Sequence, residues 1–243
     1  PAETIQSERH SFRIVTLADG LIHPWSMAFL PGGEMLVTER IGRLRLLKVG
    51  KLVPRPIQGL PRIEAGGQGG LFDVLLHPKF SENRWIYLAY RARGSGGSHT
   101  RVTRFRYDAA SHRLSDAKLI FDARPKAGGG RHFGGRMVFD RQGYLFITVG
   151  ERGDMARAQR LNDHSGSVIR LRDDGTVPND NPFVGRAGAR PEIWSWGHRN
   201  PQGIALHPDT GAVWTHEHGA QGGDEVNIIR KGANYGWPVI THG

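Results

Sequence analysis

Residues 137–151, MVFDRQGYLFITVGE, consist of two short apolar runs joined by a turn sequence. The first run, MVF, leads into DRQG, in which Asp and Gly favour a tight turn. The second run, YLFITV, is rich in the β-branched and aromatic residues that strands prefer. This pattern is typical of a two-stranded β-hairpin.

The same pattern occurs three more times, at residues 27–39, 74–90 and 204–218. Helical periodicity over ten or more residues is nearly absent, and DMARAQRLN (154–162) is the best short candidate. Further strand candidates lie between the hairpins, at residues 43–49, 101–108, 118–123, 167–174 and 225–230.

Equivalent positions in the four hairpins, Phe29, Leu76, Phe139 and Leu206, are 47, 63 and 67 residues apart. Repeats of a few strands at this period predict an all-β fold, the β-propeller, in which four-stranded blades surround a channel. Four hairpins predict about four blades. Because no low-complexity linker divides the chain, we expect residues 1–243 to form a single domain. The alternative is a β-sandwich whose hairpins resemble one another by chance.

The amino-acid composition excludes several kinds of chemistry and of binding partner. The chain has 243 residues, a formal net charge of +10 and no cysteine, so disulfides and thiolate chemistry are excluded. No apolar stretch approaches the roughly 20 residues of a membrane helix. We therefore expect no membrane span. The basic residues are scattered as single arginines, so we expect no nucleic-acid partner either. Since the chain begins at Pro1, we expect either a removed leader or a trimmed chain.

Candidate functional residues lie in loops, which in a propeller converge at one end of the channel. Gln68 stands between paired glycines, which allow a ligand to approach the backbone closely. His132 lies between Arg131 and Arg136, and like charges disfavour its cationic form, so it is a candidate base. Glu151 follows a strand, where it either orients a histidine or a ligand hydroxyl, or pairs with Arg152 on the surface.

Two later loops complete the set. Arg199 and Asn200, in GHRNPQG, offer hydrogen-bond donors suited to a carboxylate or a developing oxyanion. In HEHGAQGGDE, Glu217, Asp224 and Glu225 supply hard oxygen ligands of the kind that calcium takes. The acidic spacing is not that of an EF-hand, and DDGTVPNDN (173–181) is expected to be a turn. No phosphate-binding loop, G-x-S-x-G or H-E-x-x-H motif occurs.

These loops, in this order, resemble the soluble quinoprotein aldose sugar dehydrogenases, the family that includes soluble PQQ-dependent glucose dehydrogenase. The resemblance spans residues 23–243 and is specific as a combination. It is carried by HPWSMAFLPGG, GGQGGLFDVLLHPKF, HFGGRMVFDRQGYLFITVGERG, DGTVPNDNPF, GHRNPQGIALHP and HEHGAQGGDEVNIIRKGANYGWP.

The resemblance implies a six-bladed propeller, so about two further blades would follow residue 243 and supply basic residues for the PQQ carboxylates. It also implies a periplasmic or secreted oxidoreductase that uses PQQ and calcium, oxidises an aldose sugar at C1 to the lactone, and passes electrons to an external acceptor. We expect a monomer or homodimer.

The resemblance also implies roles for individual residues. His132 matches the general base, and Glu151 stands where the glucose dehydrogenase branch has an aspartate near that base. Arg199 matches a group that stabilises charge on the quinone, and Gln68 and Asn200 match cofactor contacts. The carbonyls of Gly219 and Ala220 match those that hold the catalytic calcium against PQQ, although Ala220 stands where related sequences often have proline. Glu225 and Tyr235 match ligands of a second calcium.

Two other functions remain open at this stage. One is a calcium-dependent lactonase on a similar propeller, with carboxylates around an ion in the channel and no quinone. The other is a non-catalytic propeller that binds sugars or proteins.

Overall fold

All four predicted hairpins are present in the structure, a computed structural model that describes residues 3–241. Each consists of two consecutive antiparallel strands, and in each case these are the first two strands of a sheet. The strand candidates between the hairpins supply the third or fourth strands. The prediction that 173–181 is a turn is also confirmed.

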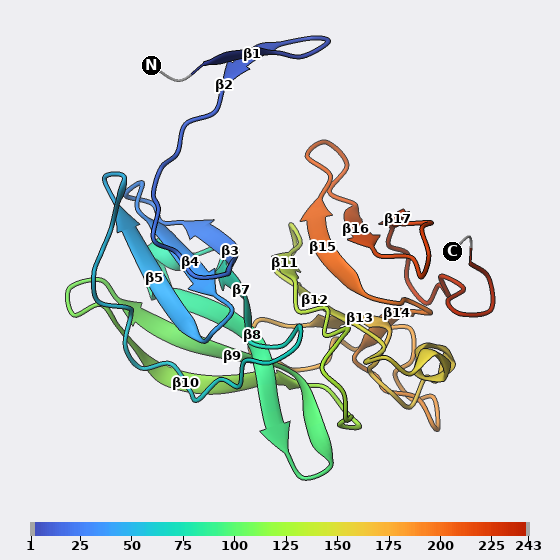
Figure 1. Cartoon of the computed structure of the whole chain (residues 1–243). Helices are drawn as coiled ribbons and strands as arrows, with labels where there is room; N and C mark the ends of the chain where they lie inside the picture. The colour runs from blue at the N-terminus through green and yellow to red at the C-terminus, as the bar shows by residue number, and fades with distance from the viewer. Residues whose placement is uncertain (1–2, 242–243) are drawn as a thin grey trace.

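Four sheets follow one another along the chain as the blades of a β-propeller, which confirms the predicted fold class (Figure 1). Three blades have four strands and the last has three. The strands are, blade by blade, β3 (Pro24–Phe29), β4 (Met35–Glu39), β5 (Arg43–Lys48) and β6 (Lys51–Leu52); β7 (Leu71–Leu76), β8 (Trp85–Gly94), β9 (Gly97–Asp108) and β10 (Arg113–Asp122); β11 (Met137–Phe139), β12 (Leu145–Val149), β13 (Ser167–Leu171) and β14 (Ile193–Trp196); and β15 (Pro201–Leu206), β16 (Val213–Glu217) and β17 (Glu225–Ile228).

The first strand of each blade lies innermost, since β3 contacts β7, β7 contacts β11, and β11 contacts β15. The apolar core fills the spaces between neighbouring blades. Every residue of β4, β12 and β13 is buried, because these central strands are covered on both faces. Continuous apolar runs such as LFITV therefore occur where a half-exposed sheet would show strict alternation.

A buried carboxylate joins three of the innermost strands. Asp73 of β7 accepts hydrogen bonds from the hydroxyl of Ser26 in β3 (2.5 Å) and from the backbone N–H of Met137 in β11 (2.8 Å). Arg136 approaches the same carboxylate at 3.4 Å. Burial raises the pKa of Asp73 although Arg136 and the two donors oppose the shift. Directional bonds to this carboxylate thus fix the register of blades one to three near the channel.

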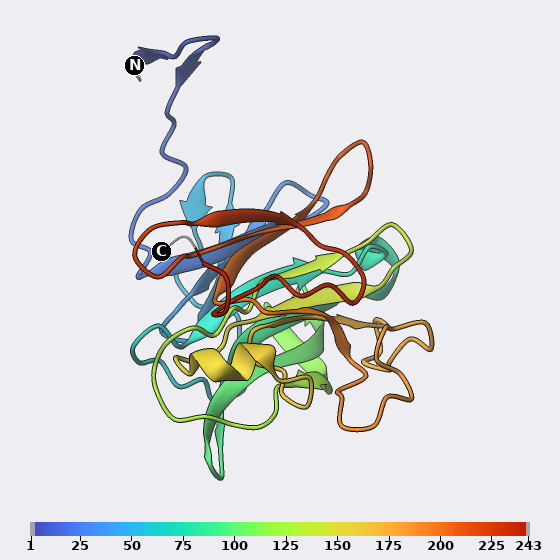
Figure 2. The same ribbon diagram turned by 90° about the vertical axis from the view of Figure 1, so that its right-hand side faces the viewer.

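Little helix is present. A short helix α1 (Phe80–Asn83) lies in the turn between β7 and β8, and a 3-10 helix η1 (Met155–Gln159) falls within the one segment predicted as helical (Figure 2). The hairpin of β1 (Thr4–Gln6) and β2 (Ser11–Arg13) stands apart from the blades (Figures 1 and 2) and was not predicted from the sequence. Among residues 3–241, no helix is long and apolar enough to cross a membrane.

A largely buried carboxylate, that of Asp122, lies in the outermost strand of blade two and contributes to stability. Asp122 of β10 bonds to His99 (2.5 Å) and to Arg101 (2.7 Å), both in β9. Burial alone would raise the pKa of Asp122, but these two partners lower it to about 2. Because the folded pKa is depressed, the ionised carboxylate stabilises the fold fully above about pH 4, and this contribution is lost as pH falls toward 2.

We therefore expect Asp122→Asn to lower the free energy of unfolding by about 2 kcal/mol at pH 7, as measured by urea denaturation. The difference from wild type should shrink between about pH 4 and pH 2. The control Asp209→Asn changes an exposed side chain and should alter stability by less than about 0.5 kcal/mol. A gap for Asp122→Asn that stays constant as pH falls would contradict the assignment.

Candidate active site

Antiparallel pairing places the predicted site residues at one end of the blades. In a hairpin, the residue before the first strand and the residue after the second strand lie at the same end of the sheet. His132 and Gln68 precede the first strands of blades three and two, and Glu151 follows the second strand of blade three. Arg199 precedes β15 and Gly219 follows β16, so the loop set of blade four lies at the equivalent end.

His132 and Glu151 form a buried pair. Nδ1 of His132 is hydrogen-bonded to Oε1 of Glu151, and the two residues are 7% and 1% exposed. A carboxylate at Nδ1 favours the tautomer that carries its proton there, which leaves Nε2 as an acceptor. Of the roles left open for Glu151, the structure therefore shows contact with a histidine and not a surface pair with Arg152.

The charge environment of His132 differs from the one expected from sequence. Arg136 is directed away, toward Asp73 and over the ring of Trp25 at 4.2 Å. Arg152 is buried and lies 3.4 Å over the ring of Phe133, where burial lowers its pKa to about 10. The charged group bonded to the imidazole is the carboxylate of Glu151, and Arg136 and Arg152 make their contacts with other groups.

The backbone around His132 is held by other site residues. His132 adopts a left-handed conformation (φ 55°), which is unfavourable for a residue with a side chain and persists only where its surroundings fix it. Its N–H donates to Oε1 of Gln68 at 2.7 Å, and its carbonyl accepts from the N–H of Arg152 at 3.3 Å. One end of the Gln68 amide thus positions the histidine, while its side chain remains exposed.

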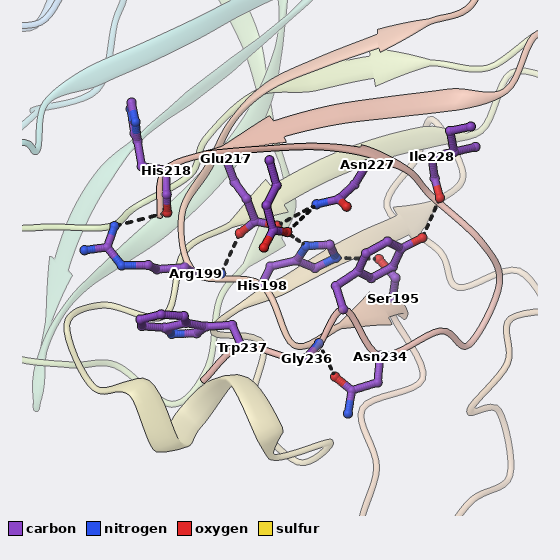
Figure 3. Close-up of polar contacts among 12 residues, drawn as sticks. Ser195, His198, Arg199, Glu217, His218, Asn227, Ile228, Asn234, Gly236 and Trp237 are labelled. Carbon is purple, nitrogen blue, oxygen red and sulfur yellow. Dashed lines mark hydrogen bonds and ion pairs between the residues drawn. The ribbon is translucent and has the colours of Figure 1, made fainter. Parts of the chain in front are cut away.

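Arg199 and Asn200 connect blade four to the His132 loop. The carbonyl of Arg199 accepts from the N–H of Glu151 (2.9 Å), and Oδ1 of Asn200 accepts from the N–H of Gly134 (3.2 Å). The guanidinium of Arg199 donates to the carbonyl of His218 at 3.2 Å and lies 5.3 Å over the ring of Trp237 (Figure 3). A continuous series of hydrogen bonds therefore runs from Gln68 through His132, Glu151 and Arg199 to His218.

Gly219 and Ala220 directly follow His218 in the chain. The N–H of Gly219 donates to Asp224 at 2.9 Å, while within residues 3–241 neither carbonyl accepts a hydrogen bond. Carbonyl oxygens without a hydrogen-bond donor are of the kind that calcium takes. The guanidinium of Arg199, which bonds to the preceding carbonyl, that of His218, suits an anionic group. The chemistry of these residues is therefore compatible with calcium and with an anionic cofactor.

The expected cluster of acidic calcium ligands is wrong for Glu217, whose carboxylate is buried and bonded to His198 at 2.7 Å. Across residues 3–241, no three His, Asp or Glu side chains gather as a metal site. The phenol of Tyr235 donates to the carbonyl of Ile228 (2.6 Å) and accepts from the N–H of Arg230 (2.8 Å), so it is already bonded within the protein. The loop folds its acidic side chains toward protein donors, which sequence spacing alone did not show.

The geometry defines a class of protein, a β-propeller with a buried histidine–glutamate pair and an arginine at the loop end of its blades. The chain belongs to the glucose/sorbosone dehydrogenase family, whose model matches residues 21–243. It is 47% identical to the aldose sugar dehydrogenase YliI of Escherichia coli over 95% of this chain and 62% of that protein. It is 27% identical to quinoprotein glucose dehydrogenase B of Acinetobacter calcoaceticus over 99% of this chain and 55% of that protein.

A solved structure of related sequence agrees. The PQQ-bound form of the aldose sugar dehydrogenase from Streptomyces coelicolor superposes with a TM-score of 0.81 at 30% identity, over 98% of this chain and 67% of that one. The chain thus spans between 55% and 62% of the two curated relatives named above.

Close packing between the two site loops yields a testable prediction. A methyl group on Gly150 would lie 2.4 Å from the carbonyl of His132 and 2.8 Å from Oδ1 of Asn200. We expect Gly150→Ala to lower the free energy of unfolding by about 1–3 kcal/mol, because the loops must separate. The control Gly128→Ala places its methyl group with no neighbour within 4 Å. Urea denaturation measures the free energy of unfolding of both variants. Equal values for Gly150→Ala and Gly128→Ala would contradict the packing described.

Proposed function

We propose that this protein is an enzyme that oxidises aldose sugars at C1 to the lactone with PQQ and calcium. The observation that carries the proposal is the buried His132–Glu151 pair, which leaves one imidazole nitrogen as an acceptor in a loop that is hydrogen-bonded to Gln68 and, through Glu151, to Arg199. The printed names of the relatives, aldose sugar dehydrogenase and quinoprotein glucose dehydrogenase, support the substrate class and the cofactor.

His132 acts as the general base in this proposal. Its Nε2 takes the proton of the anomeric hydroxyl as hydride leaves C1, and Glu151 stabilises the imidazolium that forms. Burial of both groups removes competing water and strengthens the attraction between them. Gln68 and the left-handed backbone at His132 hold the imidazole in place before substrate binds.

Arg199 and residues 216–225, HEHGAQGGDE, form the cofactor side. PQQ, when bound with calcium, supplies an electrophilic quinone that accepts the hydride. The Arg199 guanidinium would neutralise negative charge on that side, and the carbonyls of Gly219 and Ala220 would hold the catalytic calcium. Asn200 fixes the distance between this side and the His132 loop. The carboxylate of Glu225 and the carbonyl of Tyr235 are proposed as ligands of a second calcium.

The physiological setting is part of the proposal. Residues 1–243 would act as one domain in a monomeric or homodimeric protein, in the periplasm or outside the cell, with an external acceptor for the electrons. The resemblance to the soluble quinoprotein dehydrogenases supports this setting.

Titration of the full-length protein with PQQ in the presence of calcium is the first test. We expect the absorbance of the bound quinone to saturate and then to bleach when an aldose is added. Binding that leaves the quinone oxidised would contradict the dehydrogenase and favour a non-catalytic binding propeller. Failure to bind PQQ, together with calcium-dependent hydrolysis of a lactone, would favour the lactonase.

Removal of the proposed base should abolish most of the turnover. We expect His132→Ala to lower kcat by about 10²- to 10⁴-fold, the contribution typical of a general base, while PQQ still binds. The control His207→Ala lies in the loop between β15 and β16, at the opposite end of blade four, and should retain wild-type kcat. Near wild-type turnover of His132→Ala would exclude His132 as the base.

A further inference from the structure

A second buried histidine–carboxylate pair, His198 and Glu217, lies next to Arg199 (Figure 3). Nδ1 of His198 is 2.7 Å from Oε1 of Glu217, and the two residues are 0% and 5% exposed. The imidazole stacks on the ring of Tyr235, with centroids 4.5 Å apart. This pair has the same composition as His132–Glu151, but the proposed chemistry does not use it.

The pair does not belong to a hydrolytic triad. Nε2 of His198 is 2.9 Å from the hydroxyl of Ser195, so the three side chains have the connectivity of a serine nucleophile, base and carboxylate. However, Ser195 and His198 are both 0% exposed, so no substrate reaches the hydroxyl. The group must therefore act on the protein around it.

The Glu217 carboxylate gathers the donors of the turn. Oε2 accepts the backbone N–H of Arg199 at 2.6 Å, and the N–H of Asn200 is a further donor to the carboxylate. Oε1 accepts from Nδ2 of Asn227 at 3.1 Å in addition to His198. Charge-assisted bonds of this kind are about twice as strong as neutral ones. One side chain of β16 thus fixes the backbone from which Arg199 and Asn200 project.

The Arg199–Asn200 turn also contacts Glu151 and the loop that contains His132. The Arg199 carbonyl accepts the N–H of Glu151 at 2.9 Å, and Asn200 accepts the N–H of Gly134 at 3.2 Å. A displacement of the turn would therefore be transmitted to Glu151 and to the loop of His132. No other carboxylate among residues 3–241 accepts the backbone N–H of Arg199.

We propose that His198 and Glu217 are a positioning pair that sets the Arg199–Asn200 turn and, through it, the place of Glu151 against His132. This inference rests on the proposed function, because Arg199 and Asn200 are cofactor contacts only if PQQ binds. Neither His198 nor Glu217 touches the cofactor or the sugar in this proposal.

The test is Glu217→Gln in the full-length protein. The variant keeps the shape of the side chain but removes its charge and directs an amide donor at the donors of the turn. We expect faster hydrogen exchange, measured by mass spectrometry, in the peptides that contain Arg199 and Glu151. PQQ affinity with calcium should fall by about 10–100-fold, the effect typical of outer partners of a binding site. We expect kcat to fall while KM for the aldose changes little.

Glu192→Gln is the matched control. Glu192 forms another histidine–glutamate pair with His164 (3.3 Å), at the end of β14 opposite the turn. It should leave PQQ affinity, and exchange of the Arg199 and Glu151 peptides, as in the wild type. Equal behaviour of Glu217→Gln and Glu192→Gln in affinity and exchange would overturn the inference.

A second variant covers the case in which Glu217→Gln does not fold. His198→Phe retains a ring against Tyr235 but removes the donor to Glu217, so both exchange and affinity should change in the same direction. Wild-type exchange and affinity in His198→Phe would also overturn the inference. If the wild type binds no PQQ, the proposed function fails, while the exchange experiment still decides whether the pair fixes the turn.

Discussion

Antiparallel pairing of the first two strands of each blade is the constraint on which the site depends. It brings the loop before the first strand beside the loop after the second, so residues 19 positions apart, such as His132 and Glu151, become hydrogen-bonded. The same geometry in blade four brings His198 to Glu217, again 19 positions apart. Because the blades repeat this arrangement around a common channel, the loop ends of neighbouring blades meet and form one polar surface.

Buried carboxylates hold the blades in register. Asp73 joins β3, β7 and β11, and Glu217 joins β16 to the turn before β15. An apolar contact tolerates small shifts, whereas a buried carboxylate that loses a donor bears an unpaired charge at low dielectric. Such groups fix the relative position of neighbouring segments that share few backbone hydrogen bonds. The proposed chemistry requires a fixed position, since a base and an electrophile on different blades must face the same substrate.

Glycine has an equally specific role at the points of closest approach. Gly150 lies where the His132 loop and the Asn200 side chain leave no space for a methyl group. Gly197, in the turn, has a positive φ of 76°, and a methyl group there would lie 2.0 Å from the Asn234 amide. At these two positions the absence of a side chain therefore allows close packing between neighbouring segments.

Sequence alone determined the β-propeller, because its hairpins are local: turn residues and adjacent apolar runs lie within about 15 residues of each other. It also singled out Gln68, His132, Glu151, Arg199 and Asn200, since polar residues beside glycines in loops are unusual enough to notice.

Only the tertiary structure decided which groups pair. It assigned Glu151 to His132 rather than to Arg152, turned Arg136 toward Asp73, and buried Glu217 against His198 instead of presenting it to a metal. These choices depend on strand register and on the packing of one blade against the next. The physical reason is that each of these pairings joins residues far apart in the sequence, at least 19 positions, so it exists only after the strands have paired and the blades have packed.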